Sequence, residues 1–324
     1  MIGHKTEITE SAHKIQQSGT GIYHVKYLFD LDNDYKTMQK LIQDVDYVFI
    51  CRSVTEKERQ VIFSHCMMQG TGIFMVPDLF DISVKNARLH TFDDTLAFRV
   101  GRLTLSWEQQ AVKRLFDIVF SLLVIIFMSP VLLLVALLVK ISSPGPVIFK
   151  QERITRNNQP FFVYKFRTMY QGAEDETGPV FTAEDDQRVT RIGALLRSTR
   201  IDELPQFFNV LAGDMSVVGP RPERTFFVNQ FKKEFPDYEY RTTVKAGITG
   251  YAQLMGKYAT SASDKLRFDL WYIKNYSLWL DITLVLQTVK VLFVKGSYGE
   301  VTNFNITNDS GLAMHCKDGY FEVG

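Results

Sequence analysis

The sequence predicts an α/β protein in which a membrane-inserted helix joins two globular regions. Short apolar runs alternate with helical stretches from Gly21 to about Arg102, the segment Ile118–Val139 is almost uniformly apolar, and mixed patterning returns after Pro144. The chain has 324 residues, 46% of them apolar, so it is long enough for more than one hydrophobic core. We expect a first domain over 1–106, a membrane helix with its linker over 107–143, a second domain over 144–298 and a tail over 299–324.

The N-terminal region is predicted to form a small Rossmann-like parallel sheet. Its pattern reads strand, helix, strand, helix, strand, over Tyr23–Phe29, Tyr35–Gln43, Asp46–Cys51, Thr55–Gln69 and Thr71–Val76. Gly70 and Gly72 follow a helix rather than the first strand, and that strand is not followed by a GxGxxG sequence. We therefore expect a structural or regulatory domain rather than a dinucleotide site.

Charge and cysteine content exclude several functional classes. The 37 basic and 36 acidic side chains give a net charge of +1, so we expect no nucleic-acid partner. The three cysteines are far apart and lack a CxxC pattern, which excludes a disulfide framework and a structural zinc site. The first twenty residues lack the apolar core of a signal peptide, so we expect a cytosolic N-terminus.

The apolar segment meets the length needed to cross a bilayer. In its 22 positions only Ser121, Ser129 and Pro130 are not apolar. Pro130 removes a backbone donor, so the helix should kink or break at Ser129-Pro130. The segment is flanked on both sides by basic residues, namely Lys113, Arg114, Lys140, Lys150, Arg153 and Arg156. Because basic residues flank both ends, they do not indicate which end of the segment faces the cytoplasm. The sequence is compatible with a kinked helix that spans the membrane and with a re-entrant hairpin that turns back at Ser129-Pro130.

The second globular region is predicted to be mainly helical α+β and contains the polar motifs. A strand over Phe161–Met169 places Lys165 and Arg167 on one face, because side chains two residues apart point the same way. A helix over Arg188–Arg200 precedes Asp202-Glu203, which opens a second helix ended by Gly213. Farther along, Gly219-Pro220-Arg221-Pro222 forms a rigid loop presenting one guanidinium.

These residues suggest phosphate chemistry beside a membrane. Asp202 and Glu203 could supply a nucleophile together with a base or metal ligand, although Asp and Glu are also common at helix N-termini. Four cations are candidates to surround a polyphosphate, although each alone could be a solvated surface charge: Lys165, Arg167, Arg197 and Arg221. Aromatic residues over Trp271–Trp279 fit either a membrane-surface helix or an ordinary core helix pair.

Three motifs carry a family resemblance. Lys-Phe-Arg-Thr-Met at 165–169, Leu-Arg-Ser-Thr-Arg-Ile-Asp-Glu-Leu-Pro-Gln at 196–206 and Val-Gly-Pro-Arg-Pro at 218–222 closely resemble the bacterial sugar transferases, the monotopic polyprenyl-phosphate phosphoglycosyl transferases. Ser129-Pro130 matches the helix break of that family, and the resemblance runs from about Lys113 to Lys295. The N-terminal part resembles the Rossmann-like domain of large members, which carry a transmembrane bundle before it. Here no segment before residue 110 could span, so the chain is either a short form or a fragment.

The resemblance implies transfer of a hexose-1-phosphate from a UDP-sugar to undecaprenyl phosphate, with release of UMP, at the start of capsule, exopolysaccharide or O-antigen synthesis. By this resemblance, Asp202 would form a covalent phosphosugar intermediate, and Asp202 and Glu203 would hold Mg²⁺. Phosphate or nucleotide groups would be bound by four cations, Lys165, Arg167, Arg197 and Arg221. Pro220 and Pro222 would fix the loop that carries Arg221.

The implied site of action is the cytoplasmic face of the bacterial inner membrane, which favours the re-entrant topology because UDP-sugars are cytosolic. The implied partners are the lipid bilayer, a second copy of the chain and downstream glycosyltransferases. Two other functions are weighed: a non-catalytic scaffold that recruits glycosyltransferases, and a Mg²⁺-dependent enzyme of soluble nucleotides that is only anchored to the membrane. The sequence does not identify the sugar.

Overall fold

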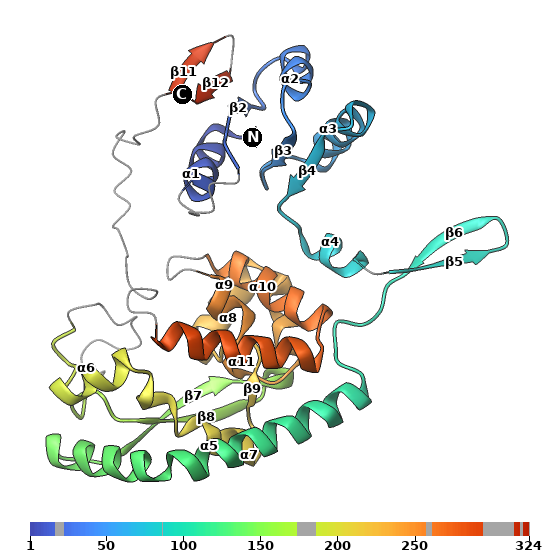
Figure 1. Cartoon of the computed structure of the whole chain (residues 1–324). Helices are drawn as coiled ribbons and strands as arrows, with labels where there is room; N and C mark the ends of the chain where they lie inside the picture. Colours follow the sequence, from blue (N-terminus) through green and yellow to red (C-terminus); the bar gives the residue numbers. More distant parts are fainter. Residues whose placement is uncertain are drawn as a thin grey trace. The chain divides into compact units, whose positions relative to one another are not determined.

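The computed structural model describes residues 1–16, 23–85, 87–173, 186–256, 261–293, 314–317 and 320–323. The chain divides into two compact units, one formed by residues 1–78 with 303–324 and the other by 79–302. Figure 1 shows the elements of each unit.

The first unit is built on a parallel sheet, as predicted. Its strands run in the order β2 (Tyr27–Asp30), β1 (Ile2–Gly3), β3 (Tyr47–Ile50) and β4 (Gly72–Met75). Side chains of α2 (Tyr35–Ile42) and α3 (Glu56–Gln69) pack with β3 in one cluster, while α1 (Lys5–Gln16) packs with β2 in another. The sequence analysis missed β1 and α1, because a two-residue strand shows no periodicity and α1 is largely polar.

Two unit boundaries differ from the prediction. The first unit ends at residue 78 rather than 106, because α4 (Leu79–Val84) contributes Ile82 to the core of the second unit. The hairpin β5 (Arg88–Phe92) and β6 (Thr95–Arg99) belongs to that second unit as well. The tail contains strands, β11 (Met314–Lys317) and β12 (Tyr320–Val323), and β12 pairs antiparallel with β2. Strand pairing between residues so far apart in the chain leaves no local pattern in the sequence. Of the predicted tail, residues 299–313 lie outside the residues that the structure describes.

The apolar segment forms α5 (Trp107–Ser142), a single helix that continues through Pro130. It begins with a capping box at Ser106. The helix is not broken at Pro130, where the sequence predicts a kink or a break, and a side-chain hydroxyl replaces the missing backbone donor. Ser129 Oγ donates a hydrogen bond of 2.9 Å to the carbonyl of Ile126, the group that Pro130 lacks an N–H to reach. Among the described residues α5 is the one helix long and apolar enough to cross a membrane, and 11% of its most apolar window is buried.

Two stretches of α5, near Lys113 and near Val139, contact other elements of the second unit, to which α5 belongs. Figure 1 shows α5 as one long helix along this unit. Near its start, Lys113 bonds to Asp281, and near its end Val139 packs with Phe166 and Leu196. Between these contacts the helix exposes large apolar side chains: Leu122, Leu123, Ile126, Phe127, Leu133, Leu134 and Leu137. The apolar segment of α5 therefore contacts the same globular unit near both of its ends.

The rest of the second unit is α+β. The strands β7 (Ile148–Ile154) and β8 (Pro160–Phe166) are antiparallel, whereas β9 (Ser216–Val218) and β10 (Gly247–Thr249) are parallel. The helices are α6 (Arg191–Ser198), α7 (Gln206–Ala212), α8 (Thr225–Glu234), α9 (Tyr251–Met255), α10 (Ala262–Lys274) and α11 (Leu278–Phe293), with 3₁₀ turns at Arg156–Asn158, Ile201–Glu203 and Pro236–Thr243.

The aromatic helix pair belongs mainly to the core of this unit. Leu270, Tyr272 and Ile273 of α10 are buried in its main hydrophobic cluster, whereas Trp279 of α11 is exposed. The structure therefore favours the core-helix interpretation for α10, and α11 alone presents a large exposed aromatic side chain here.

Candidate active site

Asp202 and Glu203 lie together in the 3₁₀ turn Ile201–Glu203, between α6 and α7. Asp202 is only 7% exposed, and its Oδ1 has no hydrogen-bond partner among the described residues. The helix-cap alternative is wrong, because the N-cap of α7 is Pro205 and no side chain caps it. Arg200, just before the pair, has a φ of 58°, a strained conformation that the surrounding structure must enforce.

Glu203 is surrounded by cations. Its Oε1 accepts a hydrogen bond of 2.7 Å from Lys165 Nζ and lies 3.4 Å from Arg221 Nη2, while Oε2 lies 3.9 Å from Arg200 Nη1. Burial favours the neutral acid, but the charges of Lys165, Arg221 and Arg200 outweigh it and hold the pKa of Glu203 far below its usual value. Glu203 is therefore ionised, and its carboxylate holds the cationic side chains around it in place.

The neighbouring carboxyl group has the opposite shift. Burial, followed by the negative charge of Glu203, raises the pKa of Asp202, against which the charges of Lys165 and Arg200 act. Adjacent carboxyl groups thus differ in their surroundings: Glu203 is held by cations, whereas Asp202 keeps an oxygen free for a ligand. Such a pair assigns different chemical roles to the two residues.

Asn209 fixes the distance between the strand that carries Lys165 and the helix that follows the carboxylates. Asn209 is fully buried, and its Oδ1 accepts a hydrogen bond of 2.9 Å from the backbone N of Tyr164. Its Nδ2 donates a hydrogen bond of 2.8 Å to the carbonyl of Phe162. Both bonds join α7 to β8, so the pairing of Lys165 with Glu203 follows from a buried amide that the sequence analysis did not identify.

The loop Pro220-Arg221-Pro222 is held by all three of its carbonyls. Pro220 O accepts from Gly247 N at 2.9 Å, Arg221 O accepts from Arg241 Nη2 at 3.0 Å, and Pro222 O accepts from Arg153 Nη1 at 3.2 Å. The backbone approach requires glycine, since a Cβ on Gly247 would lie 2.1 Å from the backbone N of Gly219. The fixed backbone leaves the Arg221 side chain directed at Glu203.

A small cavity beside Glu203 is lined by two further polar residues, Arg153 and Gln206, together with Lys165, Glu203 and Arg221; Asp202 is not part of its lining. Arg153 precedes the motifs by more than ten residues. The signal that could have identified it is the β7–β8 register, which pairs Arg153 with Phe161 and Phe149 with Lys165 and so places Arg153 and Lys165 on one face.

Two predicted phosphate ligands are placed differently. Arg197 Nε donates a hydrogen bond of 2.9 Å to Thr168 Oγ1, and its charge is among those that act on Asp202. Arg167 is buried at the end of α5, where its Nη2 donates to Ser143 O at 2.7 Å and to Ser143 Oγ at 3.0 Å. Arg167 thus terminates the membrane helix instead of lining the cavity with Lys165.

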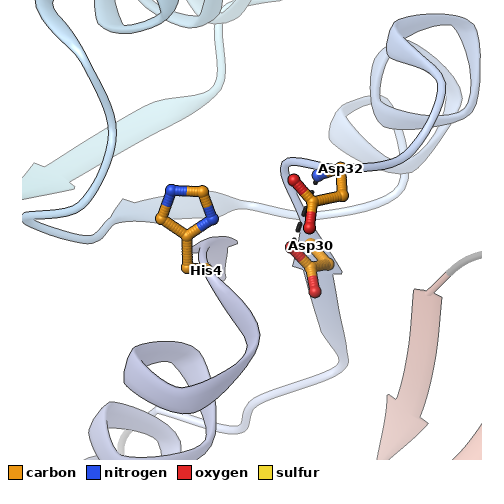
Figure 2. Close-up of side chains that lie close together, drawn as sticks. All are labelled: His4, Asp30 and Asp32. Atoms are coloured by element: carbon orange, nitrogen blue, oxygen red, sulfur yellow. Dashed lines mark hydrogen bonds between the residues drawn. The ribbon is translucent and has the colours of Figure 1, made fainter.

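A second group of polar side chains lies in the first unit. His4, Asp30 and Asp32 converge after β1 and β2, and their nearest ligand atoms lie within 4.8 Å of one another (Figure 2). His4 and Asp32 are exposed, and exposed acidic groups are common without a bound ion. Proximity alone therefore assigns this group no function.

The chain is similar to several characterised proteins. It is 49% identical over 60% of its length to a UDP-N-acetylgalactosamine-undecaprenyl-phosphate N-acetylgalactosaminephosphotransferase of Aeromonas hydrophila, covering 46% of that protein. It is 37% identical over 86% of its length to a UDP-glucose:undecaprenyl-phosphate glucose-1-phosphate transferase of Escherichia coli (strain K12), covering 62% of it. It is 41% identical to an exopolysaccharide production protein of Rhizobium leguminosarum bv. phaseoli, over 57% of its own length and 96% of that protein's.

The chain therefore spans about half to three-fifths of the length of the first two relatives. Residues 108–295, which include α5 from its second residue onward and every residue that lines the cavity, match the model of one family. More than half of the chain is covered by that match. The protein belongs to the bacterial sugar transferase family.

Proposed function

We propose that the protein transfers a hexose-1-phosphate from a UDP-sugar to undecaprenyl phosphate and releases UMP, in the first membrane step of exopolysaccharide, capsule or O-antigen synthesis. The names of the two sugar-phosphate transferases support the reaction class. The observation that carries the proposal is Asp202, a buried carboxylate with one unpaired oxygen beside a carboxylate that is saturated with cations.

Asp202 would act as the nucleophile. Its carboxylate attacks the β-phosphorus of the UDP-sugar, and the bond from that phosphorus to the bridging oxygen breaks, so that UMP leaves with the bonding electrons. A phosphate oxygen of the lipid then attacks the same phosphorus and releases Asp202. Lys165 and Arg221 would stabilise the charge on the phosphoryl oxygens, since both already lie at hydrogen-bonding or ion-pair distance from Glu203.

The residues present fit a divalent cation at Asp202. A buried carboxylate oxygen without a partner suits a hard cation such as Mg²⁺. Bound there, Mg²⁺ would supply positive charge that offsets the repulsion between the nucleophile and the diphosphate. Glu203 fits this role less directly, because its Oε1 is bonded to Lys165 and paired with Arg221. Glu203 would instead position the two cations that meet the substrate.

For membrane topology we propose a re-entrant helix at the cytoplasmic face of the inner membrane. Support comes from the contacts of α5 with one globular unit near both of its ends. In Phe127→Cys, the new thiol near the middle of the apolar segment should resist a reagent confined to the periplasm. Strong labelling from outside would contradict this topology. Association with a second copy or with downstream glycosyltransferases stays a prediction.

The reaction is tested by measuring UMP release from protein in lipid nanoparticles with Mg²⁺, undecaprenyl phosphate and one UDP-sugar at a time. Glucose, galactose, N-acetylglucosamine and N-acetylgalactosamine donors should be compared, and one is expected to be used. Asp202→Asn should abolish UMP release. The control variant Glu10→Gln, which removes an exposed ion pair between Glu10 and Lys14 on α1, should leave UMP release unchanged. Polymer synthesis that continues in cells carrying Asp202→Asn would favour the scaffold, and turnover without the lipid would favour a soluble-nucleotide enzyme.

A further inference from the structure

Arg153 is a cation of the site cavity whose carboxylate partner, Glu223, makes no hydrogen bond to it. It lies on β7, and its Nη1 is 3.8 Å from Glu223 Oε2, beyond hydrogen-bond distance. Its hydrogen bonds go to neutral groups: Nε and Nη2 donate to Gln151 Oε1, and Nη1 donates to Pro222 O. A guanidinium carries five N–H groups, so two of them have no hydrogen bond to the described residues.

Arg153 keeps its charge in a largely buried position. Burial is the main cause that lowers the pKa of Arg153 to about 10; the charge of Glu223 opposes the shift, and those of Arg221 and Arg224 add to it. Burial also lowers the pKa of Lys165, against the charge of Glu203 and with a smaller contribution from Arg221. Arg153, Lys165 and Arg221 line one cavity, so an anion bound there would accept charge-assisted hydrogen bonds from them.

The strand register separates Arg153 from the reacting end of the site. Arg153 and Lys165 share one face of the β7–β8 hairpin, but Lys165 stands opposite Phe149, four residues from Arg153 along β7. At about 3.4 Å per residue, this places their backbones roughly 13 Å apart. Lys165 is bonded to Glu203, next to the nucleophile, and Asp202 acts on the pKa of Lys165. Arg153 thus lines the same cavity as Lys165 from a position nearer the turn between β7 and β8.

We propose that Arg153 binds the nucleotide-side phosphate of the donor, the group that leaves as UMP. This inference rests on the proposed function. Lys165 and Arg221 would face the phosphorus that Asp202 attacks. The unused N–H groups of Arg153 would donate hydrogen bonds to the α-phosphate and offset the negative charge that it gains when the bridging bond breaks.

The test compares the wild type with Arg153→Gln, Arg153→Lys and Lys150→Gln, the last being an exposed cation on the same strand. In a two-stage transfer, kcat/KM for the UDP-sugar reports the first stage and kcat/KM for the lipid phosphate reports the second. For Arg153→Gln we expect the first to fall about 10- to 100-fold, as for a lost charged hydrogen bond, and the second to stay unchanged. UMP measured alone by calorimetry should bind more weakly by a similar factor.

For Arg153→Lys, both kcat/KM for the UDP-sugar and the affinity for UMP should lie between those of the wild type and Arg153→Gln. This variant also tests the inference if the glutamine variant does not fold. Unchanged donor kinetics and UMP affinity would overturn the inference. Equal losses in both stages would also overturn it, because they would show that Arg153 only fixes Pro222 and through it Arg221. Failure of the wild type to release UMP from any UDP-sugar would instead reject the proposed function, and the inference with it.

Discussion

Asp117 on the membrane helix accepts a hydrogen bond of 2.9 Å from the backbone N of Val217, in the strand that leads to the Arg221 loop. The same Oδ1 accepts a second bond of 2.9 Å from Ser216 Oγ. Asp117 is 2% exposed, so water cannot replace either bond. One buried carboxylate thus connects the apolar helix to the loop that supplies a substrate-facing guanidinium.

Removing this carboxylate should weaken both stability and activity. Asp117→Ala leaves the Val217 N–H and the Ser216 hydroxyl buried without an acceptor, so we expect the free energy of unfolding to fall by about 2–4 kcal/mol. UMP release should fall as well, because β9 positions the Arg221 loop. Asp117→Asn keeps an acceptor oxygen and should lose less. Chemical unfolding in lipid nanoparticles measures the difference; equal stability of the alanine variant and the wild type would contradict this role.

The Lys113–Asp281 pair should behave as a buried ion pair whose halves depend on each other. Lys113 Nζ bonds to Asp281 Oδ2 and lies 3.1 Å from the Tyr272 hydroxyl. Lys113→Met leaves a buried carboxylate uncompensated, which should cost roughly 3–5 kcal/mol of unfolding free energy. In the double variant Lys113→Met with Asp281→Leu, most of that loss should be recovered. A double variant as unstable as the sum of both single variants would show that the pair is not coupled.

The stability effect of Glu203 should depend on pH in a defined direction. Its pKa in the folded protein lies below its ordinary value of 4.5, so its contribution is complete above about pH 4.5 and is lost as the pH falls. Glu203→Gln should therefore lower the unfolding midpoint at pH 7, with a cost of roughly 3 kcal/mol from the unpaired Lys165 and Arg221. The difference in stability from the wild type should shrink as the pH is lowered below 4.5, toward the lower pKa of the folded protein. A difference in stability between the wild type and Glu203→Gln that grows as the pH falls would contradict this role of Glu203.

Asn209 offers a test of how the site is assembled. Asn209→Leu keeps the side-chain size but leaves the Tyr164 N–H and the Phe162 carbonyl without their partner, so we expect a loss of about 2–4 kcal/mol in unfolding free energy. UMP release should drop more than in Lys150→Gln, because β8 carries Lys165. Full activity in a folded leucine variant would show that other contacts suffice to hold Lys165 near Glu203.

Local patterns predicted much of this protein. The helices α2 and α3 and the strands β3 and β4 lie within a residue or two of their predicted bounds. The apolar residues of α2 recur at helical spacing, whereas α3 was delimited by its end signals, Thr55 and Gly70. The motifs around Asp202, Glu203 and Arg221 indicated the family from sequence alone, and the match over residues 108–295 confirms it.

Tertiary structure decided which polar residues meet. The sequence placed Lys165 and Arg167 on one strand face, but β8 ends at Phe166; Lys165 bonds to Glu203, while Arg167 bonds to Ser143 at the end of α5. Arg153 joins the cavity through strand pairing, and β12 joins the first sheet from nearly 300 residues along the chain. Composition and periodicity act over a few neighbouring residues, so the sequence determined elements and motifs; hydrogen bonds between distant segments depend on packing, so only the folded chain determined the partners of each charged group.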